Sequence, residues 1–243
     1  MVLTPTFEPG STSRYQFRLD AQFNGDRQDP EIRVPLLRSS VAYIRWLASP
    51  KSSVLVLRGE ARDTTHFSWF SPLALRLSQS WKRDGQAVAF QSCQEVDTKQ
   101  RGYRFPWVLR LLVAELLETM PAVLSLDDLE ALSTKVKKLQ REKEAIDLLE
   151  IMEQICSTLT KVYLVIDRAD LMRGDWEECL AKLCEVARPK RSGGCVFKIL
   201  IVGSRVTSDW VDVKQRLAGI LGTEDVFELH SSEYSWSDGF GKA

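Results

Sequence analysis

The chain has 243 residues, and its 33 Lys and Arg balance its 33 Asp and Glu, so the formal net charge is zero. Its 44% hydrophobic and 27% charged residues are ordinary globular values, which exclude disorder of the whole chain. A neutral chain has no overall excess of positive charge to bind phosphates, so we expect neither nucleic acid nor a membrane surface as its partner.

The length suits one large domain with shorter flanking segments. Residues 1–34 are polar with scattered Pro and Gly and predict an N-terminal arm, residues 35–230 the domain, and residues 231–243 a tail. The first helix is predicted over residues 34–48, with Pro35 in its first turn. Its apolar residues recur at helical spacing and are Leu37, Val41, Ile44 and Leu47.

Buried strands and helices alternate after this point. Residues 52–59 form a continuous apolar run, which predicts a strand buried on both faces. Residues 71–82 predict a helix, with Ser71 as its N-cap and Pro72 in its first turn. The next elements are a strand over residues 87–93 and a strongly apolar helix over residues 105–120.

The second half of the chain continues this alternation. A single helix over residues 126–159 would be about 50 Å long at about 1.5 Å per residue, so we expect a break near residues 141–144. The later elements are a strand over residues 161–167, a helix over 175–187, a strand over 196–203, a helix over 208–221 and a strand over 225–229. This order predicts a three-layer α/β fold, with a mostly parallel five-stranded sheet covered by helices on both faces.

Ligands of such sheets bind at the carboxyl ends of the strands. Asp167 and Asp170 follow the third strand, and a carboxylate in this place can hold a water ligand of Mg²⁺, which is the role of a Walker B residue. Many parallel strands also end in Asp for structural reasons. Ser204 and Arg205 follow the fourth strand, where the cation either points at a phosphate or lies on the surface.

The loop after the first strand is placed like a phosphate-binding P-loop, whose consensus is G-x-x-x-x-G-K-[ST]. Counted from Gly59, Thr64 replaces the second glycine, Thr65 the lysine and His66 the magnesium-binding hydroxyl residue. A lost charge-assisted contact costs about 1.5–3 kcal/mol, or about one to two powers of ten in affinity. We therefore expect tight ATP binding to be lost.

Aromatic residues end this loop in the run His-Phe-Ser-Trp-Phe, which includes Trp69 and Phe70. Such rings are unusual for a loop that holds phosphate. We expect them to fill the vacated crevice and extend the core. The alternative is a partner-binding patch, since aromatic side chains are enriched in protein interfaces.

The three strand ends together resemble the fungal signal-transduction P-loop NTPases, the NACHT and related STAND group, over residues 35–230. VYLVIDRADL resembles the group's strand and acidic segment, with Leu171 where a further acidic residue often stands. FKILIVGSR resembles its next strand, with Gly203 in place of Thr, and VLVLRGEARD resembles the strand that enters the phosphate loop. The resemblance implies the sheet order 5-1-4-3-2 and a role in signalling.

The resemblance and the altered loop lead us to expect a degenerate STAND-like domain that has lost ATP hydrolysis. It would act as a regulatory or protein-interaction module, with a protein partner and no cofactor. The alternative is a weakly active NTPase that binds ATP or ADP with Mg²⁺. In that case Asp167 would hold the metal, Asp170 would position water, Arg205 would sense the γ-phosphate, and Arg58 or Arg62 would replace the lysine. A third alternative is a protein-binding scaffold that needs no nucleotide.

The five cysteines are odd in number and have neither disulfide nor metal-site spacing. The first residues lack the basic-then-apolar order of a signal peptide. These features lead us to expect a reducing compartment, the cytoplasm. The longest apolar stretch, residues 107–117, contains Arg110 and Glu115 and is too short to cross a bilayer.

Overall fold

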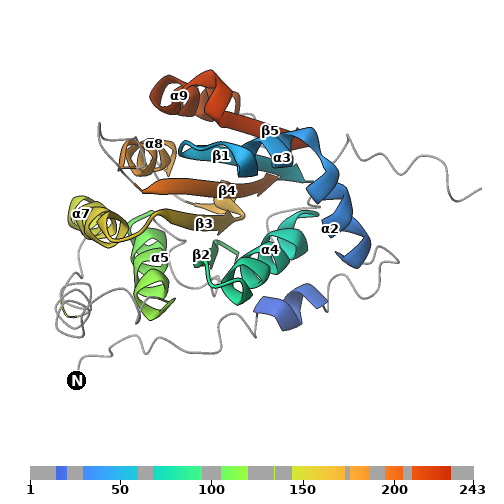
Figure 1. Ribbon diagram of the computed structural model, residues 1–243, viewed down its shortest axis with the longest axis horizontal. Coiled ribbons are helices and arrows are strands. Elements are labelled where there is room, and N and C mark those ends of the chain that lie inside the picture. The colour runs from blue at the N-terminus through green and yellow to red at the C-terminus, as the bar shows by residue number, and fades with distance from the viewer. Residues whose placement is uncertain are drawn as a thin grey trace, which may run out of the picture.

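Five strands form one sheet in the order β2-β3-β4-β1-β5 in the computed structural model of the chain (Figure 1). All neighbouring pairs are parallel. The strands are β1 (Ser53–Gly59), β2 (Ala87–Ser92), β3 (Lys161–Asp167), β4 (Val196–Ser204) and β5 (Val226–His230). Their bounds differ from the predicted ones by no more than one residue, and their order, counted from the other edge, is the predicted 5-1-4-3-2. The predicted fold class is confirmed.

The structure describes residues 15–20, 30–59, 68–94, 105–119, 134, 144–172, 176–186, 195–204 and 210–230. The helices are α2 (Pro30–Ser39), α3 (Val41–Ala48), α4 (Ser71–Arg83), α5 (Phe105–Thr119), α7 (Glu144–Ser157), α8 (Trp176–Val186) and α9 (Trp210–Leu221). Residues 15–20 are also helical. The short 3-10 helices are η1 (Ala169–Leu171) and η2 (Thr223–Asp225). Within these ranges, no helix combines the length and the apolar character that crossing a membrane requires.

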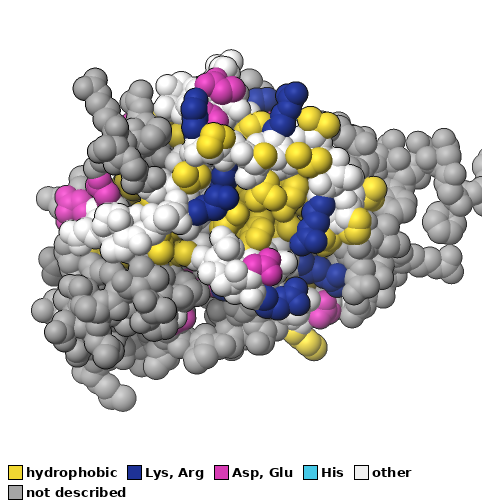
Figure 2. Space-filling view, viewed as in Figure 1, with side chains coloured by type: hydrophobic (Ala, Val, Ile, Leu, Met, Phe, Trp, Pro, Cys, Tyr) yellow, Lys and Arg dark blue, Asp and Glu magenta, His cyan; other side chains and the backbone are white. Residues whose placement is uncertain are grey.

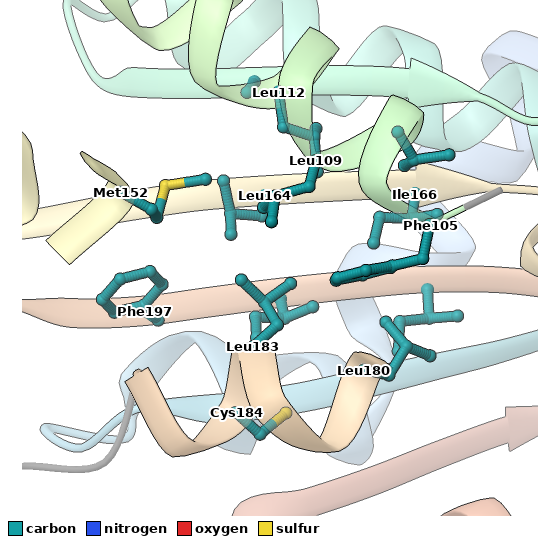
Figure 3. Packing of buried hydrophobic residues seen from close by; sticks show 14 of the residues in the cluster. Phe105, Leu109, Leu112, Met152, Leu164, Ile166, Leu180, Leu183, Cys184 and Phe197 are labelled. Carbon is teal, nitrogen blue, oxygen red and sulfur yellow. The ribbon is translucent and has the colours of Figure 1, made fainter. Parts of the chain in front are cut away.

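The helices cover both faces of the sheet and bury two apolar clusters. The first cluster joins the sheet to α5, α7, α8 and α9, and Figure 3 shows side chains of α5, β3 and α8 meeting in it. The second cluster joins the other face to α2, α3, α4 and residues 15–20. Side chains alternate along each strand, so Leu164 and Ile166 of β3 lie in the first cluster and Tyr163 and Val165 in the second.

The helix predicted over residues 34–48 is wrong in one respect, because Ser40 divides it into two helices. The Ser40 hydroxyl accepts a hydrogen bond from the backbone N–H of Tyr43 at 3.1 Å and caps α3. Pro35 lies inside α2 and not in its first turn. Beyond the break the apolar face turns, so the buried side chains differ from the predicted ones. Val41 and Ile44 are exposed, whereas Tyr43 and Trp46 are buried.

The other helices lie close to their predicted places. α4 begins at Ser71, but Phe70 is its N-cap residue, and the Ser71 side chain bonds elsewhere. α7 begins at Glu144, where the break in the long helical pattern was predicted, and residues 120–133 and 135–143 lie outside the described residues. Part of the segment predicted as an arm, residues 15–20, is helical and packs on the second cluster.

A buried ammonium group stabilises the amino end of the sheet. Lys198 of β4 is fully buried. Its Nζ donates hydrogen bonds to neutral acceptors at the end of α3 and the start of β1. These acceptors are the carbonyl oxygens of Trp46 (2.7 Å), Ser49 (2.7 Å) and Lys51 (3.1 Å) and the hydroxyl of Ser53 (2.8 Å). Burial and the neighbouring Lys161 lower the pKa of Lys198 to about 8, so the group is charged at neutral pH.

Replacing Lys198 by Met should lower the free energy of unfolding by about 3–5 kcal/mol, because the buried carbonyls lose their donor. Urea denaturation at pH 7 measures this difference. Lys214→Met is the matched control, since Lys214 is 48% exposed and contacts Glu228 on the surface. We expect its effect to stay below about 1 kcal/mol. Equal effects of the two substitutions would contradict this account of Lys198.

Candidate functional site

The carboxylate of Asp167 lies fully buried at the carboxyl end of β3. Three hydroxyl groups donate hydrogen bonds to it. Ser71 Oγ contacts Oδ1 at 2.7 Å, while Tyr15 Oη and Ser92 Oγ contact Oδ2 at 2.6 and 3.2 Å. Both carboxylate oxygens are therefore bound by side chains of this chain.

The strands and helices bring these groups together from distant parts of the sequence. Ser92 is the last residue of β2 and pairs in register with Asp167. Ser71 is the first residue of α4, and Tyr15 lies on the helical turn of residues 15–20. The backbone N–H of Cys93 donates to the carbonyl oxygen of Asp167 at 2.8 Å, which holds the ends of β2 and β3 together.

Burial raises the pKa of Asp167 to about 6, although the three hydroxyl donors and Arg168 act in the opposite direction. The guanidinium of Arg168 does not remain available for an added anion, because it forms a two-pronged contact with the carboxylate of Asp170. Its Nε lies 3.0 Å from Oδ1 and its Nη2 lies 2.9 Å from Oδ2, and both side chains are buried. Arg168 adopts a left-handed conformation, with φ of 54°, where it makes this contact.

The phosphate-loop consensus falls in another register when it is counted from the helix. In the motif, the hydroxyl residue lies at the start of the helix that follows the first strand. Ser71 begins α4 and its hydroxyl contacts Asp167, so it occupies this place. Phe70 then stands where the motif has lysine, and Trp69 where it has glycine. The prediction missed this role because it counted from Gly59 and treated Ser71 as a cap; the start of a helix at a serine was the available signal.

Phe70 extends the apolar core into this part of the site. Its ring is fully buried in the second cluster and packs edge-on against Trp69, with ring centroids 4.9 Å apart. The returning loop lies directly on the end of β1. A Cβ placed on Gly59 would lie 2.2 Å from Ser68 Oγ and 3.1 Å from the backbone nitrogen of Phe70. Glycine at position 59 therefore lets the backbone of residues 68–70 pack directly against the end of β1.

Arg58 does not join Asp167. Along β1 it is in phase with Val54 and Val56 of the first cluster, whereas Asp167 is in phase with residues of the second, so the two side chains point to opposite faces of the sheet. Arg58 Nη1 contacts Glu228 Oε1 at 3.2 Å. Glu228 also contacts Lys214 at 2.8 Å and His230 at 3.1 Å.

The remaining predicted site residues are only partly described. Ser204 pairs in register with Gly59 across β1 and β4, which places its backbone at the same end of the sheet. Arg62, Thr64, Thr65, His66 and Arg205 lie outside the described residues. Among the residues that the structure describes, no group of three or more His, Cys, Asp and Glu is arranged to hold a metal ion.

Three features point to the same fold: the strand order, α4 as the next described helix after β1, and the acidic residue at the end of β3. The fold is P-loop NTPase-like. No family model matches the chain, and no curated protein matches it either.

Among the solved structures that are similar to this chain in fold are two structures of ORC proteins. The ORC2 protein of Aeropyrum pernix in its ADP form is 16% identical with a TM-score of 0.46, and the match covers 81% of this chain and 46% of that one. The Drosophila ORC bound to DNA is 12% identical with a TM-score of 0.43, covering 90% of this chain and 30% of that one. This chain thus spans less than half of either structure's chain, and with both TM-scores below 0.5 we base its function on the residues of the site.

Glycine at position 59 should be required for stability. Gly59→Ala forces Ser68 and the loop backbone away from β1, and we expect a loss of about 1–3 kcal/mol in thermal or urea unfolding. Gly219→Ala is the control, because Gly219 lies in α9 with nothing within 4 Å of an added Cβ. There, alanine should stabilise the helix by up to about 1 kcal/mol. Opposite signs for the two substitutions are the expected result.

The pKa of Asp167 also predicts a pH dependence of folding. The pKa rises from 3.8 to about 6 on folding, so the folded state binds this proton more tightly. The stability contributed by Asp167 is therefore highest below pH 4 and falls by about 3 kcal/mol as the pH rises to 7. Urea denaturation from pH 4 to 7 should show a larger fall in the wild type than in Asp167→Asn, where Glu115 and Glu118, whose pKa values burial also raises, still contribute. Asp147→Asn, an exposed site in α7, should follow the wild type; identical profiles for all three proteins would contradict the prediction.

Proposed function

We propose that this chain is a degenerate, STAND-like P-loop domain that acts as a regulatory or protein-interaction module and does not hydrolyse ATP. The observation that carries this proposal is the enclosure of Asp167 by the hydroxyls of Tyr15, Ser71 and Ser92. The carboxylate serves as a junction between segments of the chain.

The residues around Asp167 do not fit a magnesium site. Mg²⁺ demands octahedral geometry, gives up its waters reluctantly, and is held in such sites by carboxylates together with substrate phosphates. Asp167 has no exposed surface, and its Oδ2 already accepts a hydrogen bond from the Tyr15 hydroxyl at 2.6 Å. A metal would have to displace this hydroxyl before it could bind.

The cations that phosphoryl transfer needs are also missing from the described part of the site. Phosphoryl transfer depends almost wholly on positioned cations. Phe70, at the position of the lysine, is uncharged and buried. Arg168 is paired with Asp170, and Arg58 is paired with Glu228 on the opposite face of the sheet. Asp170, and Arg58 as one of the two candidates to replace the lysine in the weakly active alternative, are thus already engaged.

The surface supports a role in protein interaction. Figure 2 shows apolar side chains gathered near the centre of one face, with Lys and Arg around them. On α3, Val41 is 64% exposed and Ile44 is 51% exposed. Exposed apolar side chains rimmed by polar ones are typical of protein-binding surfaces. We propose a protein partner and a cytoplasmic location, in keeping with the cysteines at 93, 156, 184 and 195, which are free.

One observation favours the alternative, a weakly active nucleotide-binding NTPase. The contact of Ser71 with Asp167 is the pairing expected between the hydroxyl of a P-loop and a Walker B carboxylate. In this alternative Asp167 holds Mg²⁺ once Tyr15 has left, and Arg62 or Arg205 meets the phosphates.

Calorimetric titration with ATP and ADP, with and without Mg²⁺, separates the two functions. We expect no heat of binding at millimolar nucleotide for the wild type, for Asp167→Ala and for the control Asp147→Asn. Micromolar, magnesium-dependent binding that Asp167→Ala abolishes and Asp147→Asn retains would overturn the proposed function in favour of the NTPase.

A further inference from the structure

Residues 15–20 are helical and lie at the carboxyl end of the sheet, where Tyr15 contacts Asp167; they are drawn in blue below α4 in Figure 1. Tyr15 and Leu19, four residues apart, are each 1% exposed, whereas Phe17 is 73% exposed. One side of the turn therefore meets the protein and the other faces outward, as expected for residues at i and i+4.

The surface beneath Tyr15 recognises a specific chemistry. We call it the tyrosine site and define it by Asp167, Ser71, Ser92 and Phe90. The phenol O–H donates to Asp167 Oδ2 at 2.6 Å, and the ring lies tilted against Phe90 with centroids 5.3 Å apart. Leu19 belongs to the same apolar cluster as Phe90. The site thus selects an aromatic ring with a hydroxyl donor, followed one turn later by an aliphatic side chain.

The turn depends on the site, and the sheet does not depend on the turn. The six described residues are too few to form a helix by themselves in water, and the contacts of Tyr15 and Leu19 fix them on the sheet. It adds no strand to the sheet, whose five strands all lie within residues 53–230. The turn can therefore leave without breaking a hydrogen bond of the sheet.

We propose that the tyrosine site is a docking site for a helical turn that carries Tyr and Leu four residues apart. Residues 15–20 fill it in cis, and a helix of this kind in a partner protein takes their place when they leave. This inference rests on the proposed function, since it requires that Asp167 serves protein contacts and not a metal. Regulation then consists of competition between the chain's own segment and the partner helix.

A peptide of residues 13–22 of this chain, labelled with a fluorophore, serves as the probe. In the full chain, the double variant Tyr15→Ala and Leu19→Ala empties the site, and Phe17→Ala is the matched control on the outer side of the same turn. The peptide should bind the double variant at least about tenfold more tightly than it binds the wild type or Phe17→Ala, because in those proteins the cis segment competes at high effective concentration. Binding should also raise the melting temperature of the double variant.

Two altered peptides test the chemistry of the site. Replacing the peptide's tyrosine by phenylalanine removes the hydroxyl donor and should weaken binding about tenfold. Phosphorylating the tyrosine places negative charge against Asp167 and should abolish binding. If the double variant melts without a cooperative transition, Tyr15→Phe, which keeps the ring, replaces it, and the peptide should then bind more tightly than it does to the wild type.

The proposal is overturned if a cooperatively folded variant binds the peptide no better than Phe17→Ala does. It is equally overturned if the phenylalanine and phosphotyrosine peptides bind as well as the unmodified one. If the peptide-binding tests fail and calorimetry detects no nucleotide binding, this inference is rejected but the proposed function stands. Magnesium-dependent nucleotide binding by the wild type would reject the proposed function itself.

Discussion

The hydrogen bonds to one buried carboxylate determine how the carboxyl end of this sheet is organised. A buried carboxylate must be paired or hydrogen-bonded, because leaving it unsatisfied costs several kcal/mol. In this protein the donors are three hydroxyls from β2, from the start of α4 and from residues 15–20. Asp167 thus joins segments that lie up to 152 positions apart in the sequence. The carboxylate at the end of β3 thus makes its contacts within the protein.

The sheet could be predicted from the sequence because its strands are continuous apolar runs, and a strand buried on both faces leaves that pattern in any context. The break at Ser40 could not be predicted in the same way, since apolar residues keep helical spacing across it and only the cap reveals the change of direction. The role of Arg58 was predictable in principle: its phase with Val54 and Val56 places it on the other face from Asp167. The alternation of side chains along β1 fixes which face of the sheet Arg58 lies on. Counting residues in the phosphate loop gives no information on this point.

Tyr15 could not be predicted, and the reason is physical. It stands in a polar stretch without periodicity, and the acceptor of its hydroxyl, Asp167, lies 152 positions away in the sequence. Its position is fixed by tertiary contacts, which no local pattern encodes. Lys198 is a comparable case: it interrupts an apolar strand, and the acceptors that make its burial tolerable belong to the end of α3 and the start of β1.

Asp167 and Lys198 are stabilised by the same means, since neutral dipoles surround each charge, whereas Arg168 and Asp170 neutralise each other. Under the proposed function, single substitutions in this arrangement would not create a phosphate site. A lysine at position 70 would place a new charge in an apolar cluster with no phosphate beside it, which is costly. Removing the Tyr15 hydroxyl alone would leave Asp167 with two hydroxyl donors, while the neighbouring Arg168 stays paired with Asp170. Each of these changes alone should lower the stability of the fold, because the first buries an unpaired charge and the second removes a hydrogen-bond donor from a buried carboxylate. Folding stability therefore favours the hydroxyl-bound state of Asp167.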